Sequence, residues 1–252
     1  MTVFEPRDHI DSRNQQRGSA LVLVTVICLI VAVAAGGWWY WSRLVQQKKA
    51  KGLEDELQTR LNEGNAALEQ GKMDEAYKAF LAGRRIFDDP IFLAWRTPST
   101  GPASPASELT DKSEVDQLLT TISLFKAYDE AFQLKPAAEW AGKAEEHAKS
   151  LSGPAADDTR KRVATARSVA QLIELYRQKK YETVLKDLLT VEKNSQSGDR
   201  DFFIMEVRLL IACGKGLKQP DIVAQARKLL FFLQFEARLE DSRLDQLWSL
   251  LG

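Results

Sequence analysis

The stretch NEGNAALEQGKMDEAYKAFLAGRRIF, residues 62–87, contains two helical patterns separated by a glycine. Apolar residues recur at intervals of three and four on both sides of Gly71-Lys72. The glycine predicts a turn, and a second helix is expected over Met73–Phe87, because the nearby Pro90 cannot continue a helix. The stretch therefore predicts two antiparallel helices joined by a tight turn.

Helical patterns of the same kind continue to the end of the chain, with few strand-like alternations. Further helices are expected over Val115–Phe132, Ala137–Leu151, Tyr181–Val191, Phe202–Cys213, Ile222–Arg238 and Leu244–Leu251. Another helix is expected to begin after Pro154, near Asp157-Asp158, and to run through Val163–Tyr176. Because each pair buries its apolar face only by stacking on its neighbours, the pattern predicts an all-α solenoid of about four helix pairs plus a terminal capping helix.

Composition divides this helical part in two. Residues 96–112 (RTPSTGPASPASELTDK) are rich in Pro, Ser and Thr and have no helical period, which predicts a linker. On this division residues 53–95 form a first hairpin, and residues 113–252 form a larger helical domain.

The first pair resembles a tetratricopeptide repeat. The resemblance rests on small residues where the two helices approach and on a large ring between them: Gly64, Ala67, Gly71, Ala76, Phe80 and Gly83. A weaker copy covers residues 172–191, where Tyr181 takes the usual place of an aromatic in the turn. Val184 and Leu188 take the places of Ala76 and Phe80. The other two pairs match only in length and pattern.

Members of the tetratricopeptide family generally bind peptides or partner domains in a concave groove, which the first helix of each pair lines. By position, the resemblance implies that five residues of this chain face such a groove: Asn65, Glu69, Ile173, Tyr176 and Arg177. For each of them a solvated or packing side chain is an equal alternative.

One long apolar segment precedes the helical part. Residues 19–41 carry no charge, and 23 residues at about 1.5 Å per residue span a hydrocarbon core of roughly 30 Å. Its C-terminal end holds an aromatic cluster, typical of a membrane–water interface: Trp38, Trp39, Tyr40 and Trp41. The sequence predicts a single transmembrane helix at 19–41, between a polar tail at 1–18 and a basic juxtamembrane segment at 42–52.

Two other interpretations of this segment stay open. Ala32-Val33-Ala34 has the pattern of a signal-peptide cleavage site, although the leader before it holds three acidic residues. Residues 16–21 resemble a type IV prepilin processing site with cleavage after Gly18, although Leu23 stands where that family usually has Glu. In this alternative the chain is a processed secretion or pilus-system component, whose apolar helix packs in an assembly.

The sidedness of the helical domain is only weakly indicated, because basic residues flank both ends of the apolar segment. We expect a bacterial inner-membrane protein with its C-terminal domain outside the cytoplasm, and a cytoplasmic domain is the alternative.

Charge argues against nucleic acid as a partner. The first 52 residues hold seven of the 35 basic and three of the 35 acidic side chains, which leaves the rest with a net charge of −4. Affinity for nucleic acid comes largely from neutralising phosphates, and a mildly acidic domain does not offer that.

No motif predicts catalysis, a metal site, a cofactor or a small-molecule substrate. His9 lies in the tail, and His147 follows two glutamates, where we expect a solvated helix face. The two cysteines, Cys28 and Cys213, are interpreted as small buried residues, not as a disulfide.

The most apolar features after the anchor are the run Phe231–Phe235 and the last helix, with Leu244, Leu247, Trp248 and Leu251. We expect core packing and a cap that closes the solenoid, with a docking surface for a partner or for the membrane as the alternative. The sequence as a whole predicts a non-catalytic, membrane-anchored scaffold, which binds other proteins through its helical groove or its C-terminal helix.

Overall fold

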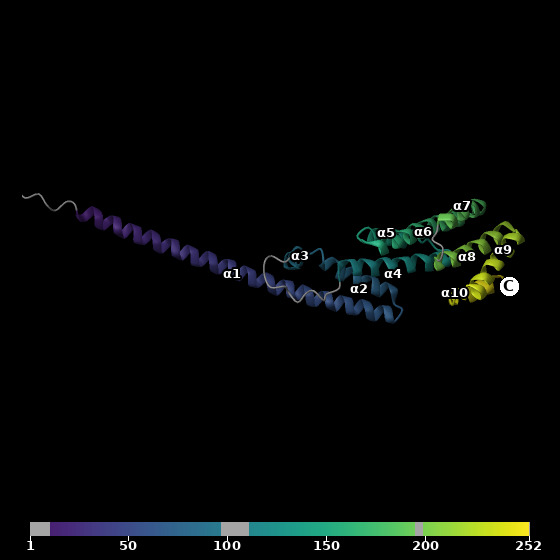
Figure 1. The fold of residues 1–252 in the computed structure, drawn as a ribbon, viewed down its shortest axis with the longest axis horizontal. Coiled ribbons are helices and arrows are strands. Elements are labelled where there is room, and N and C mark those ends of the chain that lie inside the picture. The colour runs from purple at the N-terminus through teal and green to yellow at the C-terminus, as the bar shows by residue number, and fades with distance from the viewer. Residues whose placement is uncertain (1–10, 97–110, 195–198, 252) are drawn as a thin grey trace, which may run out of the picture. The chain divides into compact units, whose positions relative to one another are not determined.

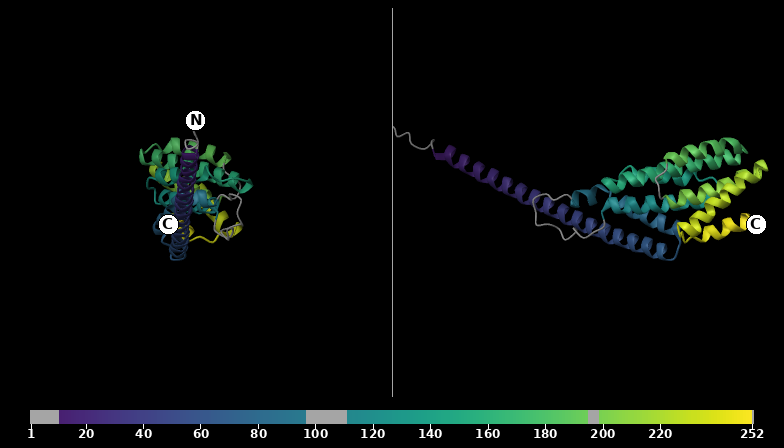
Figure 2. Two further views of the ribbon diagram at one scale, coloured as in Figure 1. Left: turned by 90° about the vertical axis from the view of Figure 1, so that its left-hand side faces the viewer. Right: turned by 45° about the vertical axis from the view of Figure 1, so that its right-hand side comes forward.

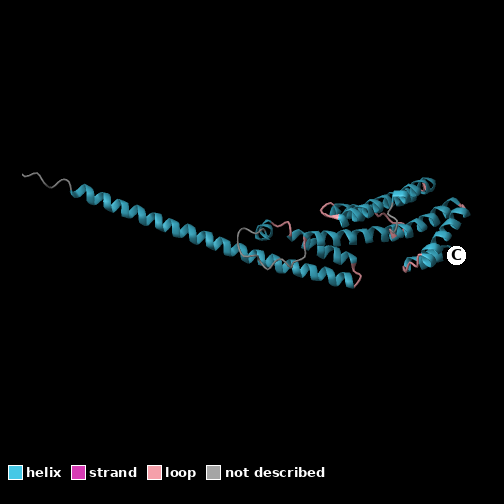
Figure 3. Ribbon diagram, in the orientation of Figure 1, coloured by secondary structure: helices cyan, strands magenta, loops and turns pink. Residues whose placement is uncertain are grey.

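The structure is a computed structural model that describes residues 11–96, 111–194 and 199–251, with side chains from residue 31 onward except at positions 154 and 194. All regular secondary structure in these ranges is helical, as Figures 1 and 3 show, so the all-α prediction is confirmed. The chain divides into two compact units, one of residues 1–55 and 89–101 and the other of residues 56–88 and 102–252.

The first unit contains most of α1 (Asp11–Glu69) and the short α3 (Pro90–Arg96). Pro90 begins a helix here as well as following one, which suits its missing N–H and its fixed φ. The carboxylate of Asp89 accepts hydrogen bonds from the backbone N–H groups of Ile91 at 2.8 Å and Phe92 at 3.4 Å, and so caps α3. Phe92 is fully buried.

The predicted transmembrane segment lies in this unit, but residues 1–10 and the side chains of residues 11–30 are outside the described part. Within the part of the chain that the structure describes, no helix is both long enough and apolar enough to span a membrane. The transmembrane helix stays a prediction, and so do the two processing sites.

The second unit consists of helix pairs. The end of α1 pairs with α2 (Met73–Ile86), and the later pairs are α4 (Lys112–Phe132) with α5 (Ala138–Ala148), α6 (Pro154–Arg177) with α7 (Tyr181–Asn194), and α8 (Arg200–Leu217) with α9 (Pro220–Phe231). A π-helical turn, η2 (Phe232–Glu236), and a last helix, α10 (Ser242–Leu251), follow. In the right-hand view of Figure 2, α9 and α10 are the adjacent yellow helices at the end of the chain.

Each turn within a pair contains one residue with a left-handed backbone. The four are Gly71, Leu134, Lys179 and Lys218, with φ between 57° and 70°. Only the first is a glycine, the residue that adopts this conformation without steric cost. The glycine of the first turn was therefore visible in the sequence as a turn signal, whereas Leu134 gave none.

The first pair packs in the way its small residues predict. A Cβ atom built on Gly64 would lie 2.7 Å from the ring of Phe80, so only glycine lets α1 and α2 approach this closely. Gly83 likewise lies against Leu57 and Arg60. Ala76 and Phe80 are fully buried between the two helices.

The pairs stack in chain order, with α2 on α4, α5 on α6 and α7 on α8. In addition α4 contacts α8 directly, although a pair lies between them in the sequence. The Tyr128 hydroxyl donates to the carboxylate of Asp199 at 3.3 Å, and Nε of Arg208 donates to the carbonyl of Phe132 at 3.0 Å. As a result α8 is buried on nearly all sides and forms the centre of the core.

Candidate partner-binding surface

The five residues that the family resemblance placed in a groove are not equivalent in the structure. Asn65, Glu69 and Arg177 are exposed, and Tyr176 is half-buried with its ring 5.4 Å from that of Tyr181. Ile173 is fully buried in the core, so it packs the fold and is not available to a partner. None of the five lines either of the two grooves found on the described surface.

The smaller of these grooves, about 500 Å³, runs between the end of α1 and α2. Alanines form much of its floor, at positions 66, 67, 79 and 82, and its rim holds both basic and acidic side chains. Short side chains and mixed charge give it little apolar area with which to hold a ligand.

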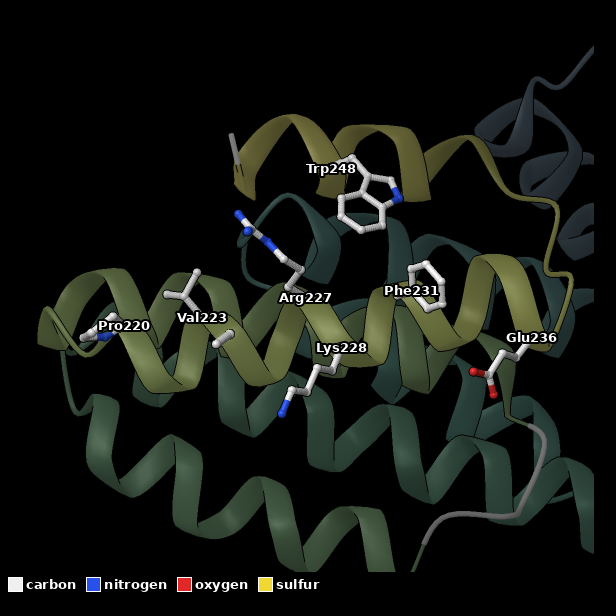
Figure 4. A pocket seen from close by; sticks show the side chains of 8 residues that line it. Pro220, Val223, Arg227, Lys228, Phe231, Glu236 and Trp248 are labelled. Carbon is white, nitrogen blue, oxygen red and sulfur yellow. The ribbon is translucent and has the colours of Figure 1, made fainter.

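The larger groove, about 850 Å³, lies between α9 and α10. Figure 4 shows its lining, which consists of Pro220, Val223, Ala224, Arg227, Lys228, Phe231, Glu236 and Trp248. The first six residues come from α9, and Trp248 faces them from α10. The Trp248 indole N–H donates to the side-chain carbonyl of Gln234, which fixes the ring as a wall of the groove.

Three phenylalanines lie on the surface at this end of α9, and Phe231 lines the groove. Phe231, Phe232 and Phe235 each expose about half of their area, at 50%, 48% and 56%, and the rings of Phe231 and Phe235 lie 4.8 Å apart. The expectation that the run Phe231–Phe235 packs in the core is wrong for these three residues. It holds for Leu233, which is buried.

The reason is a change of helix type that the periodicity did not show. A single helix was predicted over Ile222–Arg238, but α9 ends at Phe231 and the next turn is a wider π-turn. The N–H of Ala237 bonds to the carbonyl of Phe232, five residues back, and the N–H of Leu239 bonds to that of Leu233. This wider spacing rotates the residues that follow it relative to an α-helix, so that Phe235 does not stand on the face that the periodicity predicted.

The groove also carries positive charge. Arg227 and Lys228 are exposed, and among the described residues neither forms an ion pair. A terminal nitrogen of Arg227 donates to the carbonyl of Leu251 at 3.1 Å, which leaves the rest of its guanidinium open to the groove. Glu236 is the single acidic residue of the lining.

Helix α10 is held in place by buried leucines and by charge. Leu244, Leu247 and Leu251 are buried, so the predicted last helix packs its apolar face against its neighbours. At its start, Arg243 bonds to the carboxylates of Asp201 and Asp241, both at 2.7 Å. Burial alone raises the pKa of Asp241, but the hydrogen bonds from Arg243 outweigh burial and lower this pKa to about 2. The wall that carries Trp248 is therefore fixed to α8.

A second polar cluster joins α2, α4 and α5. His147 is buried, so the expected solvated helix face is wrong, and its Nε2 lies 3.0 Å from the Tyr77 hydroxyl. Its Nδ1 lies 4.0 Å from the buried carboxylate of Asp116, which also accepts bonds from Arg84 at 3.1 Å and Ser150 at 2.7 Å. The cluster lines neither of the two grooves described above, and its contacts connect helices.

The spacing of His147 is a signal that we missed. It follows Ala144 by three residues, and Ala141, Ala144 and Ala148 form the buried stripe of α5. Within the described ranges, no group of three or more His, Cys, Asp or Glu residues is placed to hold a metal ion.

All four aromatic residues of the cluster on α1 are exposed. Trp38, Trp39, Tyr40 and Trp41 expose between 58% and 77% of their area, and the Arg43 guanidinium lies 4.8 Å from the Trp39 ring. Because successive helical residues lie about 100° apart, four consecutive rings surround the helix on every side.

No protein-family model, curated protein or solved structure matches this chain. The resemblance to tetratricopeptide repeats therefore depends on the residues of the first pair and on their packing.

Proposed function

We propose that this protein is a membrane-anchored scaffold that binds other proteins through its helical domain and does not act by catalysis. The observation that carries the proposal is the groove between α9 and α10, with the half-exposed Phe231 in its lining and the half-exposed Phe235 against it. Apolar area of this kind is usually covered by a partner in soluble domains. The rigid cap formed by α10 keeps the groove open, since Arg243 and the buried leucines hold that helix in place.

The anchor is the second part of the proposal. The uncharged sequence at 19–41 and the ring of exposed aromatics around α1 support a helix that crosses a bilayer and reaches its interface at Trp38–Trp41. A ring on every side suits a bilayer better than contact with one protein face. We place the protein in a bacterial inner membrane with the helical domain outside the cytoplasm.

We propose that the helix pairs are tetratricopeptide-like, and the contact of Gly64 with the Phe80 ring supports this for the first pair. We propose that partners bind at the end of the array. The first helices of the pairs provide fewer contact residues than the family resemblance implied, because Ile173 is buried.

Two measurements test the anchor. The full-length protein is expected to remain with membranes after extraction with alkaline carbonate, and mass spectrometry of the native N-terminus is expected to show an intact leader. A protein released by carbonate contradicts the anchor. A mature chain that begins at Ser19 supports instead the processed secretion or pilus component.

Partner binding is tested by substitution on the groove side. Phe235→Glu is expected to remove the proteins that co-purify with the full chain from detergent extracts, because it places charge in an apolar contact. Phe125→Glu is the matched control, because Phe125 is another half-exposed phenylalanine and lies on α4. If the same proteins co-purify with Phe235→Glu, partners do not bind on the groove side. The same conclusion follows if Phe235→Glu and Phe125→Glu lose these proteins equally.

A further inference from the structure

The helix that follows and contacts α9 is shorter than the helices that follow and contact α5 and α7. The second helices α5 and α7 are each followed by a long helix that packs on them, namely α6 with 24 residues and α8 with 18 residues. Helix α9 is followed by α10, which has 10 residues. A short helix covers less of its neighbour, and the groove of about 850 Å³ lies beside it.

The groove has the form of a helix-binding surface. Its lining residues on α9 stand at positions 220, 223, 224, 227, 228 and 231, a spacing that marks one face of a helix. Trp248 forms the opposite wall, and Figure 4 shows it across from Phe231 and Arg227. A helix placed here would pack as the first helix of a next pair packs on the pair before it.

Charge selects among helices. The middle of the groove presents Arg227 and Lys228, and one end presents Glu236. Acidic side chains beside the apolar stripe of a bound helix would pair with the two basic residues, whereas basic side chains there would be repelled. A bilayer is a poorer occupant, because a flat surface does not fill a concave groove.

We propose that the α9–α10 groove binds an amphipathic helix of a partner protein, whose apolar stripe is flanked by Glu or Asp. This inference rests on the proposed scaffold function and names the kind of segment that the scaffold recognises. The bound helix takes the place of one further helix at the end of the array, with its apolar residues against Val223, Phe231 and Trp248.

The probes are two dye-labelled synthetic helices that share one stripe of Leu and Ala and carry either Glu or Lys on the flanks. Each is titrated against the full chain in lipid nanodiscs, with binding measured by fluorescence anisotropy. The Glu helix is expected to bind about tenfold or more tightly than the Lys helix, since two ion pairs are gained and two repulsions avoided. Added salt is expected to reduce this ratio.

Substitutions locate the binding site. Arg227→Glu with Lys228→Glu is expected to reverse the preference, so that the Lys helix binds more tightly. Lys180→Glu with Lys186→Glu changes the net charge equally at two exposed positions elsewhere and is expected to keep the preference of the unmodified chain. Hydrogen exchange is expected to slow over residues 220–236 and 242–251 when the Glu helix is bound.

Three results would overturn the inference. They are the absence of binding by both helices, an equal affinity for both, and a preference unaffected by the substitutions at Arg227 and Lys228. If hydrogen exchange over residues 220–236 slows only in the presence of anionic lipid, the groove binds the bilayer. If exchange there becomes slower as the protein concentration rises, the groove binds a second copy of the chain. Either outcome also overturns the inference. If partners still co-purify with the full chain and are lost with Phe235→Glu, the proposed scaffold function holds. Only the proposal that the groove binds an acidic amphipathic helix is then wrong.

Discussion

The hydroxyl of Tyr77 lies 3.0 Å from Nε2 of His147, and this contact joins α2 to α5 across 70 residues of sequence. On the other side of the imidazole, Nδ1 faces the carboxylate of Asp116 on α4 at 4.0 Å. Three helices from two pairs therefore meet at one buried polar cluster. Buried polar groups of this kind favour one arrangement of helices over others, because every alternative leaves some of them without a partner.

Removing the Tyr77 hydroxyl tests how much this contact contributes. Tyr77→Phe is expected to lower the free energy of unfolding by about 1 kcal/mol, the usual net value of one hydrogen bond, with more if His147 is left unsatisfied. The ring is retained, so its edge contact with Trp140 at 5.1 Å between centroids persists. Urea unfolding measures the change. Tyr181→Phe is the control, because the Tyr181 hydroxyl has no hydrogen bond to a described residue, and an equal loss in both variants would contradict the prediction.

The pH dependence of stability is expected to report on His147. Burial lowers its pKa in the folded protein, against the opposing effect of Asp116 and Glu146. The unfolded chain then binds a proton more readily, so stability is complete above the ordinary pKa near 6.5 and falls as the pH drops below it. His147→Gln is expected to flatten the stability curve between about pH 7 and pH 5. A curve that is equally steep in the variant would exclude His147 as the cause.

Glu206 is expected to lower the stability of the protein as the pH rises, whereas His147 lowers it as the pH falls. Its side chain is buried on α8, its Oε2 has no hydrogen-bond partner among the described residues, and burial together with the charge of Glu192 raises its pKa to about 7. A raised folded pKa means that stability is present at low pH and is lost as the pH rises through 7. At pH 8, the free energy of unfolding of Glu206→Gln, measured by urea unfolding, is expected to be about 1–3 kcal/mol higher than that of the unmodified protein. At pH 5 the difference is expected to be smaller. A variant that is less stable at pH 8 would contradict this.

Close packing at Gly64 is tested by adding one methyl group. Gly64→Ala places a Cβ 2.7 Å from the fully buried Phe80 ring. Overpacking costs about 1–3 kcal/mol, and the roughly 1 kcal/mol that alanine gains in a helix offsets only part of it. We expect a net loss of stability. Gly142→Ala on α5 is the matched control, because its nearest neighbour atom lies 3.7 Å away, and it is expected to be neutral or stabilising.

The ion pairs at the start of α10 predict a response to acid. The pKa of Asp241 is about 2, lowered by the hydrogen bonds from Arg243 that outweigh burial. Its stabilising contribution is therefore present above the ordinary pKa near 3.8 and is lost as the pH falls towards 2. Arg243→Gln is expected to cost about 1–3 kcal/mol at pH 7 and less at pH 2.5. Trp248 fluorescence, recorded in a protein whose other tryptophans are phenylalanine, follows the release of α10. If α10 detaches at the same pH in both proteins, the ion pairs do not hold it.

The sequence by itself determined most of the helices and the turns between paired helices, although it did not predict α3 or the π-turn. Periodic apolar residues placed α2 within one residue of its observed end, and Gly71 and Pro90 marked the turn and the end of the helix. The close approach of Gly64 to Phe80 was also visible, because a glycine opposite a large ring has one common structural cause. The spacing of the leucines in the last helix also predicted the face that is buried.

Only the tertiary structure decided which faces are covered. Periodicity shows that a helix has an apolar face, but the neighbour that covers it is set by contacts between helices far apart in the sequence. Thus Ile173 is buried and not in a groove, and His147 is enclosed by α2 and α4, because the array brings other helices over them. The opposite holds for Phe231 and Phe235, which stay exposed because the short α10 leaves them uncovered, and the π-turn changes the face on which Phe235 stands.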